Sequence, residues 1–342
     1  GVRDMGGRLA EVDQWRNLIA EGVMAGPRIF RAGPIVNGKV SDPLQIVVEN
    51  RAEGHGAVRA LRTAGVDFVK VHGGVSREAY LGISEECACG GIRFAGHIPR
   101  AIHPREAAAA GQSSFEHLYT LFDGVLTDGV EESQLAQRIR RFRESGAEEL
   151  FAGFARKGSV FTPTIVAEHA SLSLQKPQSS ELEKYCSRSA KEATRQLQEK
   201  YGALITGEYV SRGKRQLEET LPLIRMMRQA GIELLTGTDL GPSLFVPGFS
   251  LHDELEYLVD AGLRPIDALQ AATRNPARWL KQADLGTIEA GKLADMVLLD
   301  GNPLDDIRNT RKIRAVVARG KVFDRRALDA MLEAAVHSAE HG

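Results

Sequence analysis

Four side chains of the kinds that bind and activate a divalent ion stand at or near the ends of short apolar runs. They are Lys70, His97, His117 and Asp239. Imidazole rings and a carboxylate are the ligands that zinc-type ions prefer, and such an ion lowers the pKa of bound water towards ~7. Each residue alone also has a structural interpretation, as a hydrogen-bonded histidine or a salt-bridged lysine. The four together predict a metal centre that activates water.

Three further residues near this set are candidates for contact with a substrate. His72 follows Lys70 by two positions, so both share one face of a strand, and substrate contact or support of a ligand is equally open. Arg100 closely follows His97 and could receive a substrate carboxylate through two hydrogen bonds, or form a surface salt bridge. His252 lies in the segment that follows Asp239, the fourth residue of the set, and contact with a substrate or support of a ligand is open there too.

Strand-like and helical segments alternate over the first 284 residues. Seven runs have the apolar, β-branched pattern of strands: Gly1–Met5, Arg28–Val36, Val66–His72, Ile92–His97, Ser113–His117, Ser159–Ile165 and Ile232–Thr238. Amphipathic stretches of helical period separate them, and several stop at a glycine, which predicts βα units around a parallel sheet. An open doubly wound sheet is the alternative, but no GxGxxG follows the first strand, so a (β/α)8 barrel is favoured. A barrel builds its active site at the carboxyl ends of its strands.

The pattern changes after residue 284. A turn-rich stretch leads to a strand at Met296–Asp300 and to a second at Ile313–Phe323, which is interrupted near Gly320. This segment is too short to have a hydrophobic core of its own. We therefore predict a barrel over residues 1–284, part of a small β-sandwich over 285–325, and a helix or tail over 326–342.

Composition excludes several classes of protein. The 342 residues carry 44 Lys and Arg against 45 Asp and Glu, so no basic field indicates a nucleic-acid partner. No apolar run approaches the ~18–20 residues of a membrane span. Three cysteines without a CxxC pair are neither a disulfide framework nor a thiolate zinc site, which mildly favours a reducing, cytoplasmic compartment. The expected partner is a small molecule, and a homo-oligomer is compatible with the sequence.

The segments around these residues resemble the metal-dependent amidohydrolase superfamily, in its imidazolonepropionase-like and prolidase-like branch. The resemblance extends in order from residue 1 to about residue 323. It is carried by Val2–Gly7, Ala25–Arg28, Asp67–Val71, Ala95–Pro99, Phe115–Leu118, Gly237–Asp239, Ala268–Ala277 and Leu285–Asp295. The fold it implies is an amidohydrolase barrel with a small β-sandwich.

The resemblance also implies roles for the four residues. Lys70, carboxylated by CO2, would bridge two divalent ions, for which Zn²⁺ is the expected metal. His97 and His117 would ligate the second ion, and Asp239 would bind the first and take the proton from the bridging water. The implied reaction is hydrolysis of an amide C–N bond in a small substrate, such as a dipeptide, an N-acyl amino acid or a cyclic amide.

One departure from the family pattern is important. The family's first strand ends in a His-x-His pair that holds the first ion, and none of the nine histidines of this chain are spaced in that way. The chain begins at Gly1, within what resembles the second strand. We therefore expect a barrel that lacks its first strand, with the pair encoded upstream. The alternative is a catalytically inactive fragment or scaffold.

Overall fold

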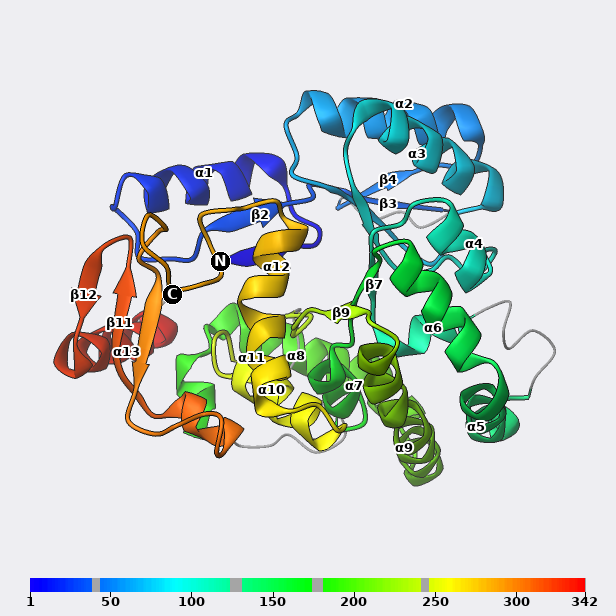
Figure 1. Cartoon of the computed structure of the whole chain (residues 1–342). Coiled ribbons are helices and arrows are strands. Elements are labelled where there is room, and N and C mark those ends of the chain that lie inside the picture. Colours follow the sequence, from blue (N-terminus) through cyan, green and yellow to red (C-terminus); the bar gives the residue numbers. More distant parts are fainter. Residues whose placement is uncertain (39–43, 124–130, 174–180, 241–245, 342) are drawn as a thin grey trace. The chain divides into compact units, whose positions relative to one another are not determined.

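The computed structural model describes residues 1–38, 44–123, 131–173, 181–240 and 246–341 (Figure 1). The chain divides into two compact units, and each is a separate body in the description that follows. The first unit comprises residues 1–131, 144–162 and 230–233. The second unit comprises residues 132–143, 163–229 and 234–342.

Parallel strands form the framework of the first unit. A seven-stranded row has the order β4-β3-β5-β6-β7-β8-β9, and β1 pairs in parallel with β2. The strands are β1 (Val2–Asp4), β2 (Ile29–Arg31), β3 (Ile35–Asn37), β4 (Gln45–Val47), β5 (Val69–Val71), β6 (Phe94–Gly96), β7 (Ser114–Glu116), β8 (Val160–Thr162) and β9 (Glu233–Leu234), the last of which lies at the boundary of the unit. Consecutive strands from β5 to β8 are direct neighbours, as in repeated βα units.

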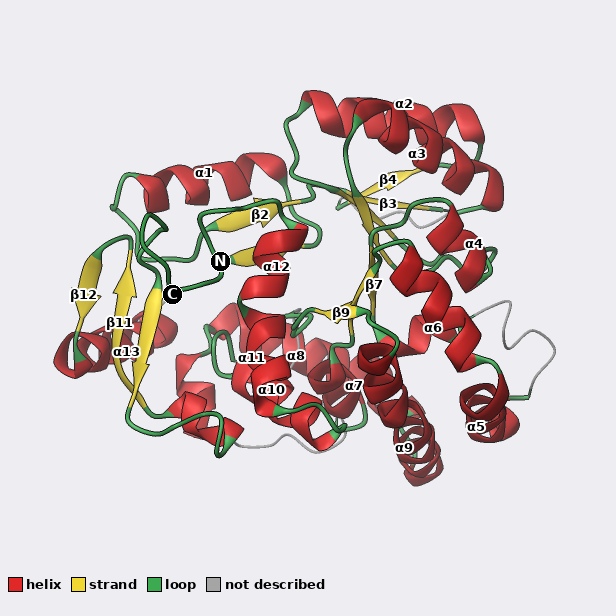
Figure 2. Cartoon of the chain, in the orientation of Figure 1, coloured by secondary structure: helices red, strands yellow, loops and turns green. Residues whose placement is uncertain are grey.

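Helices of the first unit follow β1, β4, β5, β6 and β7 along the chain (Figure 2). They are α1 (Leu9–Ala20), α2 (Arg51–Thr63), α3 (Arg77–Gly90), α4 (Pro104–Ala109) and α6 (Ala147–Arg156). The α2 and α3 helices begin at Asn50 and Ser76, whose side chains accept hydrogen bonds from backbone N–H groups of the first turn. The α3 helix ends at Gly90, and the following residue, Gly91, caps it in the left-handed region with φ of 64°. The predicted alternation of strands and helices is confirmed from β5 to β8.

Aromatic side chains fill the core between β7, β8 and α6. The ring of Phe115 stacks on that of Phe154 at 4.7 Å and lies 6.2 Å from that of Phe161. All three side chains are fully buried. Such packing holds the neighbouring strand ends at fixed positions, because a close-packed interior has little room to yield.

The second unit is mostly helical. Its helices are α5 (Leu135–Ser145, except its last two residues), α7 (Ile165–Ser171), α8 (Arg188–Tyr201), α9 (Gly207–Gln229), α10 (Ser250–Asp260), α11 (Pro265–Ala272), α12 (Arg274–Trp279) and α13 (Arg325–His341). None of the helices in the described part of the chain has both the length and the apolar character needed to cross a bilayer.

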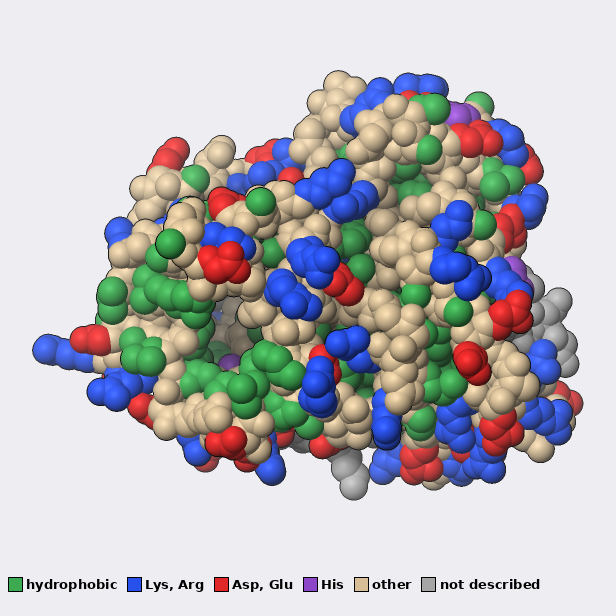
Figure 3. Space-filling model, viewed as in Figure 1, with side chains coloured by type: hydrophobic (Ala, Val, Ile, Leu, Met, Phe, Trp, Pro, Cys, Tyr) green, Lys and Arg blue, Asp and Glu red, His purple; other side chains and the backbone are tan. Residues whose placement is uncertain are grey.

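A three-stranded antiparallel sheet completes the second unit. Its strands are β10 (Met296–Leu299), β11 (Ile313–Ala318) and β12 (Lys321–Phe323), in that order. The strands expected in this region are therefore present, with the predicted interruption at Gly320 forming the turn between β11 and β12. Val297, Leu298 and Val322 are exposed on this sheet, and hydrophobic side chains are visible at the surface in Figure 3. The β-sandwich itself stays a prediction.

Three predicted elements differ from the structure. The strand expected over Arg28–Val36 is divided into β2 and β3 at Gly33-Pro34, because Gly33 has a φ of +70° and proline has no N–H to donate. The amphipathic stretch between the predicted strands Ser113–His117 and Ser159–Ile165 contains two helices, α5 and α6, which are separated at Gly146. The last predicted strand ends at Leu234, and the N–H of Thr236 instead donates to the carbonyl of Ala271.

An arginine in β1 joins three strands of the first unit. The two Nη atoms of Arg3 each donate to one carboxylate oxygen of Glu116 in β7, both at 3.2 Å. They also donate to the hydroxyls of Ser114 at 3.3 Å and of Thr162 in β8 at 2.9 Å. Burial alone would raise the pKa of Glu116, but Arg3 and then Lys70 hold that pKa below its usual range. The Glu116 carboxylate is therefore ionised inside the unit.

We predict that Arg3→Met costs about 3–5 kcal/mol of unfolding free energy, because it leaves the Glu116 carboxylate buried without its partner. The double variant Arg3→Met/Glu116→Gln should lose less, since neither charge then remains. Urea denaturation of the whole chain measures both values. Arg8→Met, which removes an exposed pair with Glu11, is the control and should cost about 0–1 kcal/mol. A double variant less stable than Arg3→Met would contradict this interpretation.

Candidate metal and substrate site

Three histidines gather at the carboxyl ends of adjacent parallel strands. His72 follows β5, His97 follows β6 and His117 follows β7. The ring centroids of His72 and His97 are 4.1 Å apart, and those of His97 and His117 are 4.8 Å apart with the rings nearly perpendicular. Because β5, β6 and β7 are direct neighbours, one edge of the sheet presents all three rings.

Lys70 is buried within β5, with 4% of its surface exposed. Gly96 in β6 makes room for its side chain. A Cβ at Gly96 would lie 2.9 Å from Cδ of Lys70 and 2.1 Å from the carbonyl oxygen of Val71. Gly96 also has a φ of +131°, which few other residues adopt. The glycine that precedes His97 thus allows the lysine and the histidine to come from neighbouring strands.

The His97 imidazole is neutral at neutral pH. Burial, followed by the charges of Lys70, His117, His72 and Arg100, holds the pKa of His97 well below its ordinary value. The neutral form is the one that donates a ring lone pair to a metal. Lys70 is close enough to act electrostatically on both His97 and Glu116, so its amine belongs to the same cluster.

His117 has an unusual backbone conformation, with φ of 68°. Its neighbours hold it there. The N–H of His117 donates to the carbonyl of Thr162 at 2.9 Å, and the hydroxyl of Thr120 donates to the carbonyls of Glu116 and His117 at 2.9 and 3.0 Å. Residues in sparsely populated backbone regions persist only when surrounding contacts determine them, and they cluster at functional sites.

The donor chemistry of this cluster fits a divalent ion. His97 and His117 are close enough for both rings to reach one ion at Zn–N distances of about 2.0–2.1 Å, and Lys70 lies beside them. A lysine becomes an oxygen ligand when it is carboxylated. Among the residues that the structure describes, no three His, Cys, Asp or Glu side chains are placed to hold one ion. The two rings alone therefore need further oxygen ligands.

The other predicted site residues are also placed by the structure. Arg100 is exposed in the first unit, and its Nε donates to Asp123 at 2.8 Å. Asp239 belongs to the second unit, where it lies beyond the end of β9 with a φ of +49°. His252 in α10 contacts Thr310 through Nδ1 at 3.0 Å. The chemical roles assigned to all of these residues stay predictions, and this includes His72, Lys70, His97 and His117. The convergence of Asp239 on Lys70, His97 and His117 also stays a prediction.

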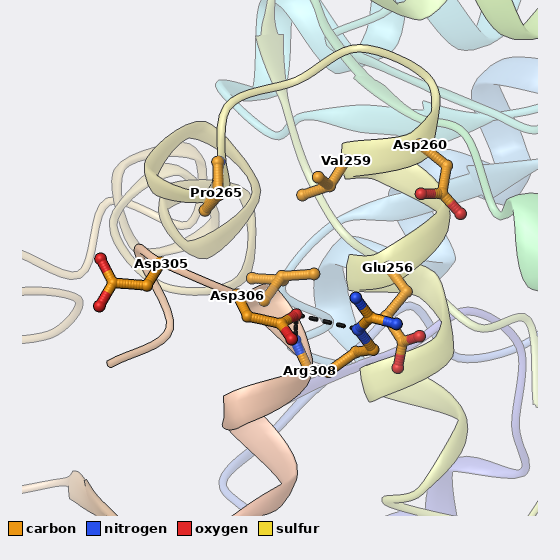
Figure 4. Close-up of a pocket in the computed structure, with 8 residues that line it drawn as sticks. Glu256, Val259, Asp260, Pro265, Asp305, Asp306 and Arg308 are labelled. Carbon is orange, nitrogen blue, oxygen red and sulfur yellow. Dashed lines mark hydrogen bonds and ion pairs between the residues drawn. The ribbon is translucent and has the colours of Figure 1, made fainter. Parts of the chain in front are cut away.

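A pocket of about 360 Å³ in the second unit has an acidic lining (Figure 4). It is lined by Glu256, Val259, Asp260, Pro265, Asp305, Asp306, Ile307 and Arg308. Arg308 donates from Nε to Asp306 at 3.0 Å, so one carboxylate is already paired. None of the residues predicted from the sequence lines this pocket.

Glu254 and Thr164 are notable residues that sequence reasoning missed. Thr164 follows β8 and has a left-handed φ of 52° at the start of α7. The carboxyl group of Glu254 from α10 is fully buried and accepts the N–H of Val166 at 2.9 Å. Burial raises the pKa of Glu254 to about 8, and the charge of Glu168 contributes to the rise. A glutamate within an amphipathic helix gives no sequence signal for such a contact.

A family model settles the family. The description of that model is "Amidohydrolase family", and it matches residues 2–323. The chain belongs to the amidohydrolase family. The resemblance on which the sequence predictions depend is therefore confirmed. Together with the mostly parallel βα row, membership indicates a TIM-barrel-like fold of the amidohydrolase type.

Named relatives of this amidohydrolase match over short segments. Imidazolonepropionase of Pyrobaculum arsenaticum is 40% identical over 80 residues, which are 23% of this chain and 20% of the relative. Ochratoxinase of Aspergillus niger is 36% identical over 101 residues, which are 28% and 20% of the two chains. Adenine deaminase of Ligilactobacillus salivarius is 33% identical over 84 residues, which are 25% of this chain and 14% of the relative. The chain thus covers a fifth or less of the length of these relatives.

Solved structures resemble the amidohydrolase chain over most of its length. Bottromycin amidohydrolase matches with a TM-score of 0.73 at 23% identity. The match covers 95% of this chain and 71% of the chain of bottromycin amidohydrolase. A Xaa-Pro dipeptidase with methionine bound in its active site has a TM-score of 0.64 at 22% identity, with coverages of 94% and 74%. At these identities the likeness concerns the fold.

We predict that Glu254 makes a contribution to the unfolding free energy of the wild-type chain that falls as pH rises from about 5 to about 8. The folded carboxyl keeps its proton up to about pH 8, whereas the unfolded one releases it near 4.5, so unfolding releases a proton in this window. The slope due to this group approaches about 1.4 kcal/mol per pH unit.

Glu254→Gln should remove that part of the slope. Urea denaturation of both proteins at several pH values measures the difference, which separates Glu254 from other titrating groups. Glu256→Gln, a change on the same helix at a less buried position, is the control and should leave the slope in place. Parallel pH profiles for wild type and Glu254→Gln would show that this carboxyl titrates at its ordinary pKa.

Proposed function

We propose that this amidohydrolase is a metal-dependent hydrolase that cleaves the amide C–N bond of a small substrate. The observation that supports the proposal best is the pair of buried rings of His97 and His117. They meet nearly at right angles beside Lys70, at the carboxyl ends of neighbouring parallel strands. This is the edge at which a barrel of this type builds its active site.

The metal chemistry of the proposal involves two divalent ions, with zinc as the expected metal. When bound, they would polarise the scissile carbonyl and lower the pKa of water towards ~7. His97 and His117 would hold one ion, and Lys70, as a CO2-derived carbamate, would be shared by both. Asp239 would help to hold the other. Gly96 leaves space for the Lys70 stem, because a Cβ there would lie 2.9 Å from Cδ of Lys70.

The proton in this reaction would move through Asp239. A carboxylate within hydrogen-bond reach of the attacking water accepts its proton and returns it to the leaving amine. The amine then departs neutral, which makes cleavage of the C–N bond easier. His72, Arg100 and His252 would contact the substrate, which we propose to be a dipeptide, an N-acyl amino acid or a cyclic amide.

The rival proposal is a catalytically inactive scaffold. It is motivated by the lack of a His-x-His pair in the 342 residues. The two proposals differ in one measurable property, since only the hydrolase needs an ion at His97 and His117.

A structural proposal accompanies the functional one. We infer that the sheet β10-β11-β12 is one layer of a small β-sandwich. The exposure of Leu298 and Val322 supports this, because the register places both on the same face of the sheet, and an apolar face of a sheet is normally covered by another layer.

We predict that Asp239→Asn lowers kcat for amide hydrolysis by about 10²–10⁴-fold, because the side-chain carboxamide that replaces the carboxylate cannot take the proton from water. The protein is incubated with Zn²⁺ and bicarbonate, bound metal is counted by mass spectrometry, and hydrolysis is assayed on dipeptides and N-acyl amino acids. The double variant His97→Ala/His117→Ala should lose one bound ion. Asp300→Asn, at an exposed aspartate of the same unit as Asp239, is the control and should keep activity.

Two outcomes would decide against the hydrolase. Asp239→Asn with full activity would remove the proposed proton acceptor. A wild-type protein that hydrolyses none of these substrates, and whose metal content is unchanged by His97→Ala/His117→Ala, would favour the scaffold.

A further inference from the structure

Arg100 presents a fixed guanidinium next to the histidine cluster. It follows His97 by three positions, and its backbone N–H donates to the carbonyl of Gly73, the residue after His72, at 3.0 Å. Its Nε donates to Asp123 at 2.8 Å, and 70% of its side chain is exposed. Within the described ranges, Asp123 is the one side chain that accepts a hydrogen bond from its guanidinium. The two Nη atoms are therefore available to a ligand.

The backbone between this guanidinium and the His97 ring carries no side chain. A Cβ placed on Gly73 would lie 3.8 Å from Nδ1 of His97 and 4.0 Å from Oδ2 of Asp123. The position thus lies between the ring and the carboxylate that orients Arg100. A residue larger than glycine would place its side chain next to both groups.

Tyr119 lies beside the rings of His97 and His117. Its ring is stacked on that of His117, with centroids 5.2 Å apart and planes within 11°, and it meets the His97 ring edge-on at 6.0 Å. Nearly half of Tyr119, 45%, is exposed. An exposed aromatic face beside two imidazoles suits the apolar side chain of an amino acid.

We infer that Arg100, oriented by Asp123, receives a carboxylate of the substrate. Binding of this carboxylate selects dipeptides and N-acyl amino acids over neutral cyclic amides. The inference rests on the proposed function, which places the scissile bond at the metal site. The reason is geometric. The Nη edge of a guanidinium matches the two oxygens of a carboxylate, whereas a carboxamide offers one oxygen and no charge.

Asp123 is a positioning residue in this arrangement. Its hydrogen bond to Nε fixes the plane of the guanidinium, which would otherwise rotate freely on an exposed side chain. A fixed plane reduces the conformational entropy lost when the carboxylate binds.

The experiment measures binding without turnover. The probes are the ketomethylene analogue of N-acetylleucine, in which CH2 replaces the scissile NH, and the primary carboxamide of the same analogue. Calorimetric titration of the Zn²⁺-loaded wild type should give a Kd for the acid at least about tenfold below that for the carboxamide, since hydrogen bonds to charged groups exceed neutral ones by this much. Arg100→Met should bind both probes equally.

Two further variants make the result specific. Arg100→Lys keeps the positive charge and loses the two parallel N–H donors of the guanidinium, so it should show an intermediate preference for the acid. Arg105→Met removes a comparable exposed arginine, which pairs with Glu149, and should keep the full preference. A structural effect of losing an exposed arginine would appear in both methionine variants alike.

Failure of this inference can be told from failure of the proposed function. Equal affinity of the wild type for acid and carboxamide, no binding of either, or an unchanged preference in Arg100→Met would overturn the carboxylate assignment. None of these results depends on hydrolysis. The proposed function is judged separately by the activity of Asp239→Asn and by the metal content of His97→Ala/His117→Ala.

Discussion

The buried pair of Arg3 and Glu116 is the interaction around which the first unit is organised. Arg3 lies in the first described strand, yet its guanidinium hydrogen-bonds residues of β7 and β8, more than 110 positions away along the chain. A buried ion pair is tolerated only when its hydrogen bonds are nearly complete, and here the fork of arginine meets both carboxylate oxygens. The next residue after Glu116 is His117, so the same pair fixes the strand end that carries a predicted metal ligand.

The backbone around the histidines is determined by its neighbours rather than by its own preferences. His117 and Gly96 both have positive φ values, and each stands at the point where a strand gives way to a loop. At Gly96 the conformation is allowed because there is no Cβ, whereas at His117 it is held by hydrogen bonds from Thr120 and to Thr162. The cost of order 1–3 kcal/mol for such a conformation is met by packing elsewhere in the unit.

Much of this arrangement can be predicted from the sequence because it depends on local patterns. Period-2 apolar runs give the strands, glycines give the helix ends, and a histidine after each of three strands gives the cluster of His72, His97 and His117. The partners of Arg3 could not be found in this way, since no local pattern links residues so far apart. The burial of Glu254 could not be predicted for the same reason. The pattern of its helix gives no sign of it, and only the fold places the carboxyl group against the start of α7.

The fold and the chemistry of this amidohydrolase therefore have different physical origins. Strand ends and buried charges set where two imidazoles and a lysine meet, and these features are compatible with many amide-like substrates. Relatives named imidazolonepropionase, ochratoxinase and adenine deaminase match segments of the same chain, although their names denote different substrates. What distinguishes one substrate from another must lie in the loops after the strands. In the first unit those loops contribute Arg100, Tyr119 and Asp123, of which the sequence alone singled out only Arg100. A guanidinium with its plane fixed by one carboxylate and its free edge exposed is a feature that neither the barrel core nor the metal ligands require. The oriented guanidinium of Arg100 is therefore best explained by the substrate that the site binds.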